Sequence, residues 1–141
     1  MRFVDTNILL YAVSTAAEER SKSRLALSLL EANDLALSVQ VLQEFYVQAT
    51  RPGKPHRLTH EQAAALVESF LRFPVQEITL PLMQGALKTR ARFRISYWDA
   101  AIIEAARCLG CEVVLSEDLN EDQDYAGVKV VNPFTDRRKL R

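Results

Sequence analysis

The stretch RISYWDAAIIEAARCLGCEVVL, residues 94–115, combines a buried helix with a strand. Ser96 is a typical helix N-cap residue, and Gly110 stands where a helix would end. The β-branched segment Val113–Leu115 then predicts a short, apolar strand. Asp99 is unexpected, because it places a carboxylate at the front of the most apolar helix in the chain.

Short apolar strands alternate with helices along the rest of the chain. Further strands are predicted at Phe3–Val4, Leu35–Ser38, Val75–Ile78 and Val128–Val131. Helices are predicted from Asn7 or Ile8, over Lys22–Ala32, from Ser38 to about Ala49, from Thr59 to Leu71, from about Pro81, and from Ser96 to Gly110. This alternation predicts an α/β fold with a short-stranded, mostly parallel central sheet and helices on both faces. Because no repeat or linker interrupts the pattern, we expect one domain spanning residues 1–141.

Composition sets limits on the class of protein. The chain has 141 residues, of which 48% are apolar and 26% are charged, as is ordinary for a globular protein. It contains neither an apolar run of about 20 residues nor a signal-peptide pattern, so we expect no membrane span. Two cysteines imply no disulfide framework, and a reducing cytoplasm is the expected location.

The 18 basic and 18 acidic residues cancel, so the total charge alone does not predict a nucleic-acid-binding protein. The charges are nevertheless unevenly distributed. Acidic residues gather at residues 117–124, and basic residues gather at residues 51–57, 88–94 and 137–141. Such blocks are usually solvated surfaces, but basic arms around an acidic centre would also suit a phosphodiester substrate.

Four carboxylates from distant parts of the chain are expected to meet at one edge of the sheet. Asp5 directly follows the first strand, and Asp118 comes just after the strand at Val113–Leu115. Glu44 lies in the second turn of the helix that follows the second strand, and Asp99 heads its own helix. Ligands of open α/β sheets bind beyond the carboxyl ends of the strands. Clustered carboxylates repel one another, and a hard divalent cation, Mg²⁺ or Mn²⁺, relieves that repulsion.

Each of these acids also has a purely structural explanation. Asp5 could cap the first helix, and Asp99 stands three residues after Ser96, which is the spacing of a capping box. Glu44 could be a solvated helix residue, and Asp118 lies in a turn-like segment. The expected convergence of all four is the observation that favours a functional site.

The chain resembles the PIN domain family, and most closely the VapC-type ribonuclease toxins. The resemblance covers nearly the whole chain and is specific in combination. Its motifs are FVDTNILLY at residues 3–11, SVQVLQEFYV at 38–47, ISYWDAAIIEAA at 95–106, LSEDL at 115–119 and VVNPF at 130–134. It implies a metal-dependent endoribonuclease that uses Mg²⁺ or Mn²⁺, a cognate antitoxin as partner, and a homodimer.

The resemblance also implies roles for individual residues. The catalytic quartet is Asp5, Glu44, Asp99 and Asp118. Within it, Asp5, Asp99 and Asp118 would hold the metal, and Glu44 would orient or deprotonate the attacking water. Supporting roles are expected for Thr6, Asn7, Ser116 and Asp122. From charge alone, the residues expected to contact the RNA backbone are Arg51, Lys54, Arg57, Arg90, Arg92 and Arg94.

Other interpretations stay open at this stage. One is a PIN nuclease that is not a toxin, and another is a phosphatase with Asp5 as nucleophile, although Asn7 stands where such enzymes commonly carry a second Asp. A third is a non-catalytic module whose acidic pocket binds a basic partner. Cys108 and Cys111 form a CxxC pattern without further zinc ligands, so we expect packing roles for them. The pair Tyr97–Trp98 is expected to pack into the core at the start of its helix.

Overall fold

The protein is described here by a computed structural model that covers residues 1–135. Five short strands form one sheet in the spatial order β3-β2-β1-β4-β5, and all neighbouring strands pair in parallel. The strands are β1 (Arg2–Val4), β2 (Leu35–Ser38), β3 (Val75–Gln76), β4 (Val113–Leu115) and β5 (Lys129–Val131). An isolated antiparallel bridge joins Asp124 to Lys129 beside β5. The predicted mostly parallel sheet is therefore confirmed.

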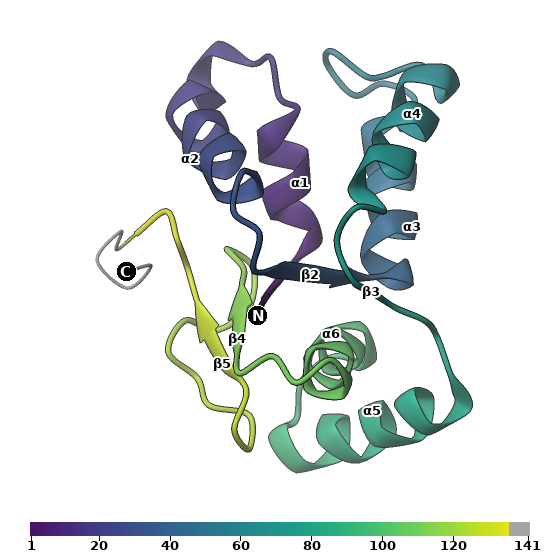
Figure 1. The fold of residues 1–141 in the computed structure, drawn as a ribbon, viewed down its shortest axis with the longest axis vertical. Coiled ribbons are helices and arrows are strands. Elements are labelled where there is room, and N and C mark those ends of the chain that lie inside the picture. Colours follow the sequence, from purple (N-terminus) through teal and green to yellow (C-terminus); the bar gives the residue numbers. More distant parts are fainter. Residues whose placement is uncertain (136–141) are drawn as a thin grey trace.

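Helices cover both faces of this sheet, as expected. Figure 1 shows α1 to α4 on one side of β2 and the paired helices α5 and α6 on the other. Their bounds are α1 (Thr6–Ala12), α2 (Arg20–Leu30), α3 (Val39–Ala49), α4 (His60–Phe70), α5 (Leu80–Phe93) and α6 (Tyr97–Cys108), with a short 3₁₀ turn, η1, at Ala17–Glu19. None of the helices described has the length and apolar character that crossing a membrane requires.

The helix starts agree closely with the capping signals in the sequence. Ser38 caps α3 and accepts the Val41 N–H, while Thr59 and Gln62 form both hydrogen bonds of a capping box on α4. Such caps satisfy backbone N–H groups that have no partner within the helix. After α6, Gly110 has a φ of +75°, a conformation that glycine adopts without steric cost.

Two expectations about local structure were wrong. The predicted strand at residues 75–78 forms a ladder only at Val75–Gln76, because the chain then leaves the sheet to reach Thr79, the N-cap of α5. Trp98 does not pack into the core: its side chain is 64% exposed, because the first turn of α6 borders a pocket. Tyr97, by contrast, is half-buried and packs against the core as expected.

The core lies where the central strands meet α6. Phe3 and Val4 of β1 and Val114 and Leu115 of β4 are completely buried, and α6 is buried without interruption over residues 100–106. A helix that is apolar on all sides is typical of such an interior position. These buried elements meet at the sheet edge where the acidic residues were expected, since β1 and β4 end there and α6 begins there.

Candidate active site

The topology brings the residues after β1 and β4 together. The two strands pair in parallel with Val4 opposite Leu115, so the next residues, Asp5 and Ser116, lie side by side. The Ser116 hydroxyl donates a hydrogen bond of 2.8 Å to Asp5 Oδ2. The chain proceeds from β1 through β2 to β3 in one direction and then continues with β4 on the other side of β1. Ligands of parallel sheets bind at such a reversal of strand order.

All four acidic residues line one small pocket at this reversal, with a volume of about 120 Å³. Asp5 comes from the end of β1, Glu44 from α3, Asp99 from the first turn of α6 and Asp118 from the loop after β4. The other lining residues are Thr6, Asn7, Leu10, Gln48, Trp98 and Ile102. The predicted convergence of the carboxylates is thus what the geometry shows.

Asp5 is the most deeply buried of the four acidic residues, with only 7% of its surface exposed. Its Oδ1 accepts the backbone N–H of Thr6 at 2.8 Å, and its Oδ2 accepts the Ser116 hydroxyl and, at 3.4 Å, the Asn7 amide. Burial raises the pKa of Asp5 to about 6, and the neighbouring carboxylates Glu44 and Asp118 add to this increase. Asp5 therefore caps α1 and also faces the acidic pocket, so the two interpretations of this residue are compatible.

Glu44 is held at both oxygens by neutral donors. The Thr6 hydroxyl donates to Oε2 at 2.8 Å, and the Gln40 amide donates to Oε1 at 2.9 Å. Gln40 also donates to the main-chain oxygen of Trp98 at 3.2 Å, which ties α3 to the first turn of α6. The sequence interpretation missed Gln40, although its position four residues before Glu44 places the two on the same face of a helix.

Asn7 connects the two strand ends. Its Nδ2 donates to Asp118 Oδ2 at 3.1 Å and to Ser116 Oγ at 3.4 Å, and its Oδ1 accepts the backbone N–H of Glu117 at 3.1 Å. Ser116 Oγ also accepts the backbone N–H of Asp118 at 3.1 Å. One amide and one hydroxyl thus hold the exposed Asp118 against the buried Asp5.

Asp99 occupies a helix N-terminus and the pocket at the same time. Its backbone N–H donates to the Ser96 hydroxyl at 3.1 Å, and its carboxylate is half-buried. Burial is the main cause that raises the pKa of Asp99, and Asp118 and Glu44 contribute through their charges. The positive end of the helix dipole favours a carboxylate at this position.

The structure places Asp122 outside this pocket. Asp122 has a φ of +63°, its backbone N–H donates to Val130, and its carboxylate lies 3.9 Å from the Lys129 ammonium. The turn redirects the chain after Asp118, so closeness in sequence does not bring Asp122 to the other acids.

The six basic residues predicted to contact RNA are all exposed. Lys54 lines a larger cavity of about 370 Å³, which shares Asn7, Leu10 and Asp118 with the carboxylate pocket. Arg51 lies in the same loop, while Arg90, Arg92 and Arg94 lie at the end of α5, next to the start of α6. In residues 1–135, none of the six forms an ion pair. The basic run at residues 137–141 lies outside the described residues.

A fifth acid, Glu117, lies near the pocket and has a cation of its own, and the sequence analysis did not single it out. Glu117 accepts the Tyr11 hydroxyl at 2.5 Å and lies 2.6 Å from the Lys22 ammonium. The ammonium also lies 4.9 Å from the centre of the Tyr11 ring. Tyr11 stands four residues after Asn7 on the same side of α1, which is the only sequence signal for this cluster.

The donor set fits a hard divalent cation. Four carboxylates offer only oxygen ligands, the preference of Mg²⁺ and Mn²⁺. Within residues 1–135, no three acidic, histidine or cysteine side chains are arranged to ligate one ion directly. This spacing still suits Mg²⁺, which usually keeps several water ligands and contacts one or two carboxylates.

Comparison with known proteins identifies the family. Residues 2–126 match the PIN domain, and the chain belongs to the PIN domain family. The resemblance seen in the sequence motifs is therefore confirmed. None of the curated proteins matches the chain.

Several solved structures share the fold over nearly the full chain. A toxin–antitoxin complex from Klebsiella pneumoniae superimposes with a TM-score of 0.68 at 22% identity, covering 94% of this chain and 98% of that one. VapC20 from Mycobacterium tuberculosis, described as a toxin that cleaves the sarcin–ricin loop, has a TM-score of 0.64 at 20% identity and covers 84% and 90%. FitAcB from Neisseria gonorrhoeae has a TM-score of 0.68 at 17% identity and covers 96% and 99%.

Proposed function

We propose that this protein is a divalent-metal-dependent endoribonuclease and the toxin of a toxin–antitoxin pair. The observation that carries the proposal is the single pocket lined by Asp5, Glu44, Asp99 and Asp118 in a PIN domain. Isolated acids at caps and turns are common, but four acids from distant segments around one pocket are not explained by capping. Their mutual repulsion favours a cation, and a bound cation favours a phosphate group.

In this proposal Asp5, Asp99 and Asp118 would hold one Mg²⁺ or Mn²⁺, partly through water. When bound, the ion would polarise the scissile phosphate and favour ionisation of a water molecule. Glu44 orients the attacking water through its carboxylate and accepts a proton from it. The Thr6 hydroxyl and the Gln40 amide hold the Glu44 carboxylate in place. Ser116 and Asn7 keep Asp5 and Asp118 together.

The reaction is hydrolysis of an RNA phosphodiester. The water oxygen forms a bond to phosphorus, the bond between phosphorus and O3′ breaks, and the leaving oxygen takes up a proton. The products carry a 3′-hydroxyl and a 5′-phosphate. The exposed cations Arg51, Lys54 and Arg57 in the loop after α3, and those at the end of α5, contact the RNA backbone.

Partners and location complete the proposal. The neighbours with the same fold include a toxin–antitoxin complex, and VapBC2 from Rickettsia felis was solved bound to a promoter DNA fragment. By analogy, we propose a cognate antitoxin, a homodimer, a cytoplasmic location and a single domain spanning residues 1–141 for this chain. The unpaired state of Cys108 and Cys111 supports a reducing compartment.

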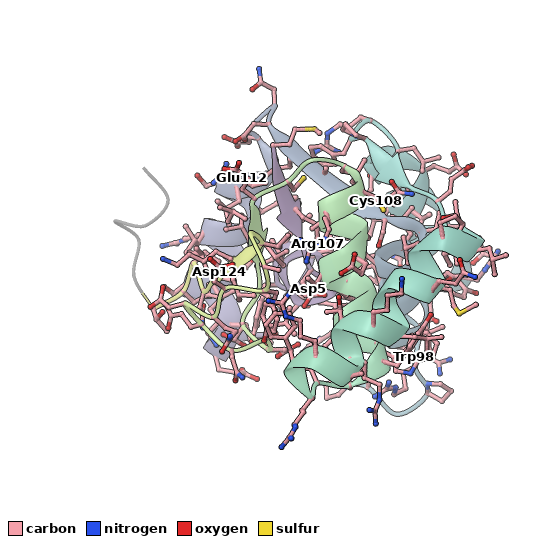
Figure 2. All side chains as sticks on the ribbon, turned by 90° about the horizontal axis from the view of Figure 1, so that it is seen from below. Asp5, Trp98, Arg107, Cys108, Glu112 and Asp124 are labelled. Carbon is pink, nitrogen blue, oxygen red and sulfur yellow. The ribbon has the colours of Figure 1, made fainter. Side chains whose placement is uncertain are left out.

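The decisive experiment is cleavage of a mixed cellular RNA pool by the purified protein. Parallel reactions contain Mg²⁺, Mn²⁺ or EDTA, and the Asp99→Asn variant tests the pocket. Glu112→Gln is the matched control, because it neutralises an exposed acid at the opposite end of β4, which Figure 2 shows well away from Asp5. Discrete cuts that require metal, vanish in Asp99→Asn and persist in Glu112→Gln are the expected result.

Other outcomes point to the remaining hypotheses. Cleavage that persists in Asp99→Asn would identify a contaminating nuclease. Phosphate trapped covalently on Asp5 after incubation with a phosphomonoester would favour a phosphatase. Absence of cleavage together with absence of Mn²⁺ binding would favour a non-catalytic module. Cleavage without growth inhibition on expression in bacteria would favour a PIN nuclease that is not a toxin.

A further inference from the structure

Trp98 is a large, exposed aromatic residue that lines the carboxylate pocket. The residue is 64% exposed and lies in the first turn of α6, where Figure 2 labels it. Leaving so large an aromatic side chain in water forgoes the stabilisation that burial would provide. An exposed aromatic ring beside a polar pocket is a feature of ligand-binding surfaces.

The indole is also held in place. Its ring meets the Tyr97 ring edge-on, with centroids 5.0 Å apart and an angle of 82° between the planes, and Tyr97 itself packs against the core. The main-chain oxygen of Trp98 accepts the Gln40 amide that also holds Glu44. The helical turn that carries the ring is therefore tied to the helix that carries Glu44, and the ring itself rests against Tyr97.

We infer that Trp98 is a stacking platform for a nucleobase of the RNA substrate, next to the nucleotide whose phosphate lies among the carboxylates. This inference rests on the proposed function and names a positioning residue for it. Stacking on an aromatic ring suits single-stranded RNA, whose unpaired bases can turn outward, and it is tolerant of base identity. The 370 Å³ cavity with Lys54 and His56 adjoins the pocket at Asn7, Leu10 and Asp118 and does not include Trp98, so it leaves room for the strand to continue beyond the carboxylates.

A direct test uses the fact that Trp98 is the only tryptophan in the chain. Its fluorescence is recorded while a pool of single-stranded RNA hexamers is added to the full-length wild-type protein in EDTA. The titration is repeated in Mg²⁺ with the Asp5→Asn variant. An abasic ribose-phosphate hexamer supplies the same backbone charge without bases. We expect quenching by the RNA and no quenching by the abasic oligomer.

Variants separate stacking from a structural role. Trp98→Ala should weaken RNA binding by roughly 5- to 100-fold, appearing in KM more than in kcat, and Trp98→Phe should restore most of the affinity. Leu80→Ala is the matched control, because Leu80 is also 64% exposed but does not line the pocket. It should leave both constants unchanged.

Failure of this inference is distinguishable from failure of the proposed function. Equal quenching by RNA and abasic oligomer, or an unchanged KM in Trp98→Ala that still cleaves RNA, would overturn stacking and leave the nuclease intact. Base-dependent quenching without cleavage by the wild type would support stacking and overturn the nuclease. Emission that responds to protein concentration and not to RNA would show that a second copy covers the indole, which also overturns stacking.

Discussion

Two carboxylates are buried to nearly the same extent, Asp5 at 7% exposure and Glu104 at 8%, but their electrostatic surroundings are opposite. Glu104 on α6 lies 3.2 Å from the Arg107 guanidinium and accepts a hydrogen bond of 2.5 Å from the Thr89 hydroxyl. Asp5 accepts hydrogen bonds from neutral groups and faces the carboxylates of Glu44 and Asp118. Figure 2 labels Asp5 and Arg107, the cation that distinguishes the two environments.

The difference separates an acid whose counter-ion the protein supplies from an acid without one, and only the second suits the proposed metal site. The protein supplies the counter-ion of Glu104, and the same arginine donates to the main-chain oxygens of Tyr125 and Ala126, each at 2.7 Å. Glu104 therefore contributes to holding the segment before β5. Asp5 instead carries a charge that its surroundings disfavour, and a cation from solution would remove that penalty. The comparison predicts that the two acids respond oppositely to neutralisation.

The largest expected effect is on catalysis. Asp5→Asn should lower the rate of RNA cleavage by roughly 100- to 1000-fold, because it removes a charge needed only when the metal and substrate are bound. The same change should not lower the free energy of unfolding of the metal-free protein. Cleavage rates in Mg²⁺ and urea denaturation in EDTA provide the two measurements. Loss of stability without loss of activity would place Asp5 in the same class as Glu104.

The second prediction concerns pH. Below pH 4 Asp5 is protonated in the folded and unfolded states, whereas between pH 4 and 6 the unfolded chain loses this proton first. Since the folded pKa of about 6 lies above the ordinary value of 3.8, the stability contributed by Asp5 should fall as pH rises through this window, by roughly 3 kcal/mol. The difference in unfolding free energy between wild type and Asp5→Asn, measured in EDTA from pH 4 to 7, isolates this contribution. A difference that does not vary with pH would contradict it.

Neutralising Glu104 should lower stability and leave cleavage unchanged, which is the reverse of the result expected for Asp5. Glu104→Gln should lower the free energy of unfolding by about 2 kcal/mol, because Arg107 loses its charged partner but remains partly hydrated. Cleavage per folded molecule should stay near the wild-type level. Urea denaturation and a cleavage assay normalised to folded protein test both parts. A stable variant with impaired cleavage would mean that Glu104 serves the site.

The smallest effect is expected at Glu117, which lies beside the pocket but has its own cation. Glu117→Gln should cost less than about 1 kcal/mol of stability, since both members of the Glu117–Lys22 pair remain partly exposed to water. RNA cleavage should remain close to that of the wild type. A loss of cleavage as large as that expected for Asp5→Asn would add Glu117 to the acids proposed to act in cleavage.

The convergence of the four carboxylates was predictable because it depends on simple rules. Asp5 and Asp118 come just after strands, Asp99 heads a helix, and parallel strands end at a common edge. The hydrogen bonds of Gln40 and Asn7 were not predictable, because they depend on how segments far apart in sequence approach one another.

The exposure of Trp98 and the position of Asp122 outside the pocket could not be predicted, because each depends on the surrounding tertiary structure. The apolar character of Trp98 predicted burial, but the start of α6 lies at the rim of a pocket. Asp122 is close to Asp118 in sequence, but its left-handed backbone conformation turns the chain toward Lys129. Residue type and spacing do not show whether a helix end lies at the molecular surface, and they do not show in which direction a turn takes the chain.

The pairing of β1 with β4 also determines when the pocket can exist during protein synthesis. β1 leaves the ribosome first, but its neighbour β4 follows more than a hundred residues later, with Val4 opposite Leu115. Until residues 115–118 have emerged, Asp5 lacks the Ser116 hydroxyl that holds it and the pocket lacks Asp118. Contacts this distant in sequence form late in folding. A nascent chain that ends before residue 115 therefore carries three of the four carboxylates without the complete pocket.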